Sequence, residues 1–103
     1  MYMYKNGMRY LAESKVKDGF HFHNDISVKI GKNIVRTIRL QIDGRLSAGA
    51  LISFKTQMKK IHFVKLNNSK LTHSIDYIIE NNEAIAFTFN LIDKDKIEIE
   101  GLT

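Results

Sequence analysis

Two histidines and an aspartate in the segment GFHFHNDISVKIG have the spacing that most directly suggests chemistry. His21, His23 and Asp25 follow one another at intervals of two residues, and alternate residues of a strand lie about 6.6 Å apart on one face. His-x-His on a strand is a zinc-ligand spacing, because two imidazoles can converge on one tetrahedral ion. His21 and His23 are therefore the candidate metal ligands, and a third donor would have to come from His62 or His73.

An ordinary surface strand explains the same histidines without a metal, and we favour that interpretation. The even-numbered residues of 20–30 are apolar except for one asparagine, and the odd-numbered residues are polar or charged. This alternation predicts one long, half-buried strand. Its expected inside residues are Phe22, Ile26 and Val28, and its expected outside residues are His21, His23 and Lys29. We expect His73 to point toward the core, and we predict neither a metal site nor a cofactor.

No catalytic constellation is visible in the rest of the sequence. The chain has no cysteine, so it has no thiolate nucleophile and no Cys-ligated zinc. The segment GRLSAGA lacks the lysine of a phosphate-binding P-loop. The paired carboxylates, Asp93 with Asp95 and Glu98 with Glu100, fall in a turn and on the polar face of a strand. We therefore predict that the protein is not an enzyme.

The elements that must position these residues are strands. Seven apolar or alternating segments begin at Phe20 and are separated by turn residues: 20–30, 34–42, 45–54, 60–66, 70–79, 84–92 and 96–102. The short turn signals Asp43-Gly44, Asn67-Asn68 and Asn81-Asn82 predict that consecutive strands pair as antiparallel neighbours. The sequence therefore predicts an all-β fold, in which a single domain over 1–103 is an antiparallel meander forming a small β-sandwich or β-barrel.

Residues 1–19 are compatible with two local structures. Asn6-Gly7 favours a hairpin, whereas the segment MRYLAESKVK could form a short helix that ends at Asp18-Gly19; we favour the hairpin. The chain has no apolar run long enough to span a membrane, and its first residues lack the apolar stretch of a signal peptide. We expect a cytoplasmic protein, or a virion component if the protein is phage-derived, and no membrane partner.

Charge is distributed unevenly along the chain. Residues 1–70 carry 14 Lys and Arg against 4 Asp and Glu, whereas residues 71–103 carry 2 Lys against 7 Asp and Glu. The net charge is +5. This asymmetry predicts two electrostatically different surfaces. It has three explanations: a basic surface for nucleic acid, a basic surface of one protomer meeting an acidic surface of another, or neutralisation within one subunit.

The candidate binding surface consists of basic side chains and N-terminal aromatics. Its members are Lys29, Arg36, Arg39, Lys55, Lys59, Lys60, Lys65, Tyr2 and Tyr4. A single-stranded nucleic acid would require outward-facing aromatic rings on which bases can stack. Most aromatic residues share the parity of core residues, which leaves the N-terminal tyrosines and Phe54. The alternating MYMY segment is better suited to pairing with another chain.

These patterns favour a non-enzymatic protein-binding or self-assembly module whose partner is another protein or a copy of itself. The abundance of Ile, Lys and Asn is typical of an AT-rich genome. It suggests a phage or mobile-element protein, such as a virion part or an inhibitor of a host protein. The alternative is a single-stranded nucleic-acid-binding β-barrel that uses the basic surface, and a small-ligand-binding barrel ranks third.

Overall fold

A computed structural model of the chain describes residues 19–103, and this part folds entirely into antiparallel strands and the turns between them, without a helix. This confirms the predicted all-β class. The strands are β1 Phe20–Ile30, β2 Asn33–Ile42, β3 Arg45–Leu46, β4 Leu51–Ser53, β5 Lys60–Leu66, β6 Ser69–Lys70, β7 Tyr77–Glu80, β8 Ala84–Phe87, β9 Leu91–Ile92 and β10 Lys96–Leu102. The described residues include no helix that could span a membrane.

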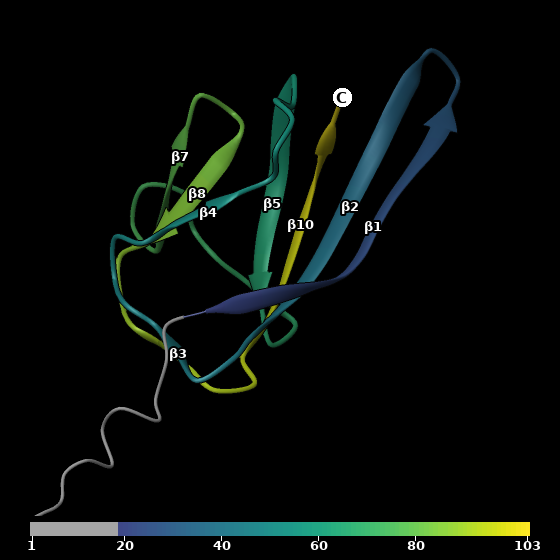
Figure 1. Cartoon of the computed structure of the whole chain (residues 1–103). Helices are drawn as coiled ribbons and strands as arrows, with labels where there is room; N and C mark the ends of the chain where they lie inside the picture. Colours follow the sequence, from purple (N-terminus) through teal and green to yellow (C-terminus); the bar gives the residue numbers. More distant parts are fainter. Residues whose placement is uncertain (1–18) are drawn as a thin grey trace, which may run out of the picture.

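The strands form one large sheet, one small sheet and a ribbon. The large sheet has the order β1-β2-β10-β5-β6, the small sheet has the order β4-β8-β7, and β3 pairs with β9. Figure 1 shows β4, β7 and β8 on one side of the molecule and the long β1–β2 hairpin on the other. The arrangement resembles a small sandwich, and no sheet closes into a barrel, so the hollow interior that a small-ligand-binding barrel requires is missing from residues 19–103.

The core lies between one face of the large sheet and the smaller elements. Alternate residues of β2 and β10 enter it, because every second side chain of a strand points to the same face. The buried residues include Ile38, Leu40, Ile42, Ile52, Phe54, Met58, Val64, Tyr77, Ile85, Phe87, Leu91, Ile97 and Ile99. We call the opposite face of the large sheet the outer face.

The prediction of a simple meander is wrong. β10 lies between β2 and β5, and it is antiparallel to both. β2 therefore has β1 on one edge and β10 on the other, which leaves no edge for β3. Asp43-Gly44 does not close a hairpin, because the chain leaves the large sheet there and β3 pairs with β9.

Two of the predicted turns are confirmed. Asn67 and Asn68 both have positive φ, at 49° and 71°, and they connect the paired strands β5 and β6. Asparagine tolerates this left-handed region better than most residues, and two such residues in succession define the turn that matches strand twist. Asn81 and Asn82 also have positive φ, and they lie in the connection between the paired strands β7 and β8.

Three of the predicted strands are interrupted. Segment 45–54 divides into β3 and β4, segment 84–92 divides into β8 and β9, and segment 70–79 is a strand only at its two ends. The turn between β6 and β7 leaves His73 exposed, with its ring 5.5 Å from that of Tyr77. The expectation that His73 points into the core is therefore wrong.

β1 is one continuous strand as predicted, but it does not keep its expected inside and outside faces. A β-bulge shifts the register between Phe22 and Asn24. A bulge adds one residue to one strand only, so it exchanges the faces of all residues beyond it. Phe22 lies opposite Leu40 on the core side, whereas Val28 lies opposite Val35 on the outer face.

The expected burial of β1 is consequently wrong. Phe22 is 37% exposed, Ile26 48% and Val28 53%. Among residues 19–103, the strand forms the edge of the large sheet, and Figure 1 shows its hairpin with β2 on the side of the molecule opposite β4, β7 and β8. Residues 1–18, which include Tyr2 and Tyr4, lie outside the described residues. The prediction of a hairpin or a short helix for 1–19 therefore falls outside them as well, apart from Gly19.

Candidate functional site

The histidine pair at the start of β1 is held by an aspartate from another turn. His21 Nδ1 lies 2.5 Å from Asp43 Oδ2, and His21 Nε2 lies 2.9 Å from His23 Nε2. The two imidazoles lie beside the β1 bulge, with ring centroids 4.7 Å apart. The expectation that Asp25 lines up with them is wrong, because the same bulge moves Asp25 to the core side, opposite Ile38.

This geometry is poor for metal binding. His23 and Asp43 contact opposite edges of the His21 ring, so the three side chains cannot converge on one ion. No group of three or more metal-ligating side chains occurs within 19–103, and a tight zinc site needs three or four protein ligands. The arrangement is instead a hydrogen-bonded chain, in which Asp43 orients His21 and His21 contacts His23.

We expect protein purified without a histidine tag to contain far less than one equivalent of zinc or another transition metal. Elemental analysis checks this directly. His23→Ala should leave the metal content unchanged. Near-stoichiometric zinc that disappears in this variant would show that the imidazoles bind metal with donors that the described residues do not reveal.

Arg36 is a core residue rather than a surface cation. It lies on the core face of β2 and is 7% exposed. Its Nε and Nη2 donate hydrogen bonds to Asp25 at 2.8 and 2.6 Å, Nη1 donates to Thr56 Oγ1 at 2.7 Å, and Nη2 also donates to the Phe54 carbonyl at 2.9 Å. The guanidinium therefore connects β1, β2 and the 54–56 loop. Arg36 was expected among the surface cations of the candidate binding surface, and its burial removes it from that set.

This contact makes stability depend on pH. Hydrogen bonds from Arg36 hold the pKa of Asp25 below its ordinary value of 3.8. A carboxylate whose folded-state pKa is depressed contributes stability above its unfolded-state pKa, and that stability is lost as pH falls through the folded-state value. We expect the free energy of unfolding of the wild type to be higher than that of Asp25→Asn, and the difference between the two proteins to be constant from pH 5 to 7. The difference should shrink below about pH 4; a difference unchanged down to pH 2 would contradict this.

The outer face brings together charges that are far apart in the sequence. Glu98 of β10 lies opposite Arg39 of β2 on one side and opposite Lys65 of β5 on the other. The Arg39 guanidinium is 3.6 Å from the Glu98 carboxylate, and His62 is 3.5 Å from Glu100. Because acidic β10 is inserted between basic strands, the charges of this sheet alternate across it instead of forming two separate surfaces. This arrangement favours neutralisation within one subunit.

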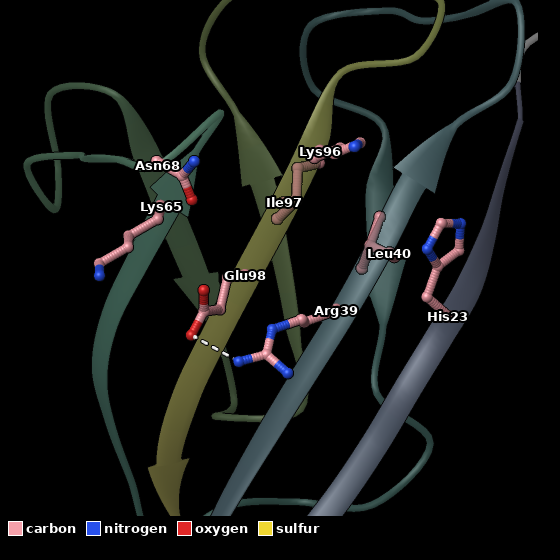
Figure 2. A pocket seen from close by; sticks show the side chains of 8 residues that line it. All are labelled: His23, Arg39, Leu40, Lys65, Asn68, Lys96, Ile97 and Glu98. Carbon is pink, nitrogen blue, oxygen red and sulfur yellow. Dashed lines mark ion pairs between the residues drawn. The ribbon is translucent and has the colours of Figure 1, made fainter.

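A hollow of about 250 Å³ lies among these charges on the large sheet. Figure 2 shows that Arg39 and Glu98 face each other across neighbouring strands, with Lys65 beyond Glu98 and His23 near the sheet edge. The complete lining is His23, Arg39, Leu40, Lys65, Asn68, Lys96, Ile97 and Glu98. Three of these residues are Lys or Arg and one is an acid, so the hollow has an excess of positive charge.

Of those members of the candidate binding surface that the structure describes, only Arg39 and Lys65 meet at this hollow. Lys29 lies near the tip of the β1–β2 hairpin, and Lys60 begins β5 opposite Leu102. Lys55 and Lys59 lie in the connection between β4 and β5. These cations do not follow one continuous groove across the described residues.

Within residues 19–103, few aromatic rings are available to bind bases. Phe54, one of the rings considered for stacking, is 1% exposed, so that expectation is wrong. Phe63 lies on the outer face, but its ring carries the Lys65 ammonium 5.1 Å from its centroid. This cation–π contact already occupies one face of the ring.

A row of exposed and half-buried apolar side chains on the outer face was not anticipated from the sequence. Val28 of β1, Val35 of β2 and Leu102 of β10 lie opposite one another, and Ile26 and Ile30 flank Val28 along β1. We name these residues the hairpin patch: Ile26, Val28, Ile30, Val35 and Leu102. Its β1 members are the most exposed, with Ile30 at 59%. The only sequence feature that could have indicated the hairpin patch was the alternation of apolar residues. That alternation is equally compatible with a face buried in the core and with an exposed face that binds a partner.

Comparison of the chain with protein-family models, curated proteins and solved structures gives no match.

Proposed function

We propose that this protein is a non-enzymatic protein-binding or self-assembly module that uses the hairpin patch. The observation that supports this function is the contiguous apolar surface on the β1–β2 hairpin, where Ile26, Val28 and Ile30 are 48%, 53% and 59% exposed. Soluble domains expose single apolar residues routinely, but contiguous apolar surface is typical of interaction sites. Three neighbouring strands contribute to the hairpin patch, so it is not a scattered set.

The edge position of β1 supports the same function. Among the described residues, β1 pairs with β2 on one side only, and its other edge presents backbone N–H and C=O groups to which another strand could bind. Extended chains bind such edges through main-chain hydrogen bonds and gain specificity from alternate side chains. The protein therefore combines an apolar face and a hydrogen-bonding edge on the same hairpin. A phage or mobile-element origin would suit a small assembly module of this kind, and remains part of the proposal.

Site-specific photocrosslinking tests the proposed function. A photoreactive amino acid at position 28 should give a discrete crosslinked product with a second copy or with another protein of the cell in which the chain is produced. The control is position 92, because Ile92 is also an exposed apolar residue, at 66%, but lies on β9 away from the hairpin patch. Equal crosslinking from positions 28 and 92 would contradict the proposal.

The second candidate function is single-stranded nucleic-acid binding, supported by the excess of positive charge at the hollow beside Arg39 and Lys65. The scattered cations and the Phe63 ring, one face of which contacts Lys65, make it the weaker proposal. We expect single-stranded DNA to bind no more tightly than about 1 μM at physiological salt, the range of nonspecific electrostatic binding.

Fluorescence anisotropy with the Arg39→Glu/Lys65→Glu double variant tests this candidate. Lys55→Glu/Lys59→Glu is the matched control, because it makes the same charge change in the connection between β4 and β5, away from the hollow. Submicromolar binding that is lost in the double variant and retained in the control would rank nucleic acid above protein as the partner.

A further inference from the structure

We propose that the partner of β1 is β1 of a second copy, and that the two strands pair antiparallel with Ser27 of one opposite Ser27 of the other. This inference rests on the proposed function and specifies its partner. A two-fold axis through Ser27 would join the two large sheets into one continuous sheet. Such an interface is closed, because each copy uses the same surface.

The backbone of β1 determines which residues can pair. The β1–β2 turn has two residues, and Gly31 has a positive φ of 62°, as the first position of a type II′ turn requires. A two-residue hairpin closes on a hydrogen-bonded pair, here Ile30 and Asn33. Because orientation alternates along a strand, Asp25, Ser27 and Lys29 direct their N–H and C=O groups to the free edge.

The length of the regular segment points to the same centre. The bulge interrupts β1 between Phe22 and Asn24, and the turn begins at Gly31. The uninterrupted segment is therefore Asn24–Ile30, and its middle residue is Ser27. Two copies that pair over this segment would each end at the bulge of the other, where pairing stops.

Charge selects this register among its neighbours. With Ser27 at the centre, Asp25 of each copy lies opposite Lys29 of the other, which gives two opposite-charge pairs. A centre at Asp25 or at Lys29 would place like charges directly opposite, which is destabilising. The Asp25 side chain is 44% exposed, and a carboxylate has about four acceptor sites, so it can accept from Lys29 of the second copy while it binds Arg36.

Apolar contacts follow the same register. Ile26 of each copy would lie opposite Val28 of the other, on the outer face, where both belong to the hairpin patch. The two patches would then become one continuous apolar surface across the two-fold axis. Directly opposite β-branched residues stabilise a sheet, and both of these side chains are about half exposed in the single chain.

A single cysteine tests the register, because the chain contains no other. Under mild oxidation, Ser27→Cys should form a covalent dimer, doubling the 11.9 kDa mass. The opposed Cα atoms would be about 5.5 Å apart, within the range for disulfides. The matched control is Lys29→Cys, two residues away on the same edge, whose two thiols would be separated by roughly four residues of strand, about 13 Å. It should remain monomeric on denaturing gels.

Sedimentation of the full chain separates this inference from the proposed function. We expect a dimer that is lost in Ser27→Pro, because proline removes a donor at the free edge, and weakened in Lys29→Glu. Equal disulfide formation at positions 27 and 29, or a dimer unaffected by Ser27→Pro, would overturn the register. Crosslinking from position 28 to a different protein, with a monomeric chain in sedimentation, would overturn the inference and leave the proposed function standing.

Discussion

Replacing Gly101 with alanine is expected to lower the free energy of unfolding by about 3 kcal/mol, which is the upper part of the usual range for overpacking. Gly101 is buried in β10 at the bulge opposite β5. A Cβ at this position would lie 2.2 Å from the Lys60 carbonyl oxygen and 2.7 Å from Met58 Sδ. The first atom belongs to the backbone of the paired strand, so relief requires β5 to move away from β10.

Urea denaturation measures this effect, and Gly19→Ala is its control. The nearest atom to a Cβ at Gly19 is the Asp43 carbonyl oxygen at 3.8 Å, an ordinary contact distance. We expect this control to change the free energy of unfolding by no more than about 0.5 kcal/mol. Similar midpoints for the two variants would mean that β5 and β10 are not as close at Gly101 as the structure places them.

Replacing Arg36 with methionine should have the second large effect, a loss of about 3 kcal/mol. Methionine retains much of the side-chain length and removes the guanidinium. The substitution leaves the Phe54 carbonyl and the Asp25 carboxylate without their donor. Removing one partner of a buried ion pair costs about 3–5 kcal/mol, and the half-exposed Asp25 carboxylate reduces that cost because water can solvate it.

Arg39→Met is the matched control on the same strand. Arg39 points to the outer face, its side chain is 51% exposed, and its partner Glu98 is 3.6 Å away. Exposed ion pairs of this kind contribute about 0–1 kcal/mol. Thermal or urea unfolding of the two variants should therefore differ clearly. Equal destabilisation would contradict the distinction between the core-facing and the outward-facing arginine.

Local sequence predicts where most strands of this protein lie and which neighbours pair through short turns, but it does not predict the pairing of strands that are distant in the chain. The alternation of Ile97 and Ile99 with Glu98 and Glu100 predicts β10, and the paired asparagines at 67–68 predict the turn after β5. Period-two alternation states that a strand has one apolar face. It contains no information on which strand lies beside it, so the insertion of β10 between β2 and β5 was not predictable.

The bulge in β1 shows a second limit. Its extra residue, near His23, is not marked by a glycine, and Asn24 is the one polar residue in the apolar register that Phe22, Ile26 and Val28 share. A single asparagine does not specify a bulge. Only pairing with β2 reveals that these residues occupy different faces. The bulge therefore explains both why the expected burial of Ile26 and Val28 is wrong and why the hairpin patch was missed.

Part of the candidate site could have been predicted. Arg36 shares its parity on β2 with Ile38 and Leu40, so an arginine on the core face was visible in the sequence. Its partner was not visible, because the bulge moves Asp25 to the core side. Arg39 and Lys65 lie on the outer face, but the position of acidic β10 between them depends on long-range pairing.

The position of β10 has a consequence for synthesis of the protein. The middle strand of the large sheet is the last of the described strands to emerge from the ribosome. Until then, β2 and β5 have no shared neighbour, and their apolar faces remain exposed to other nascent chains. Sheets that depend on such distant pairings fold slowly, and exposed strand edges during that interval promote aggregation. Production yield should therefore respond more to temperature and chaperone supply than the small size of the domain would suggest.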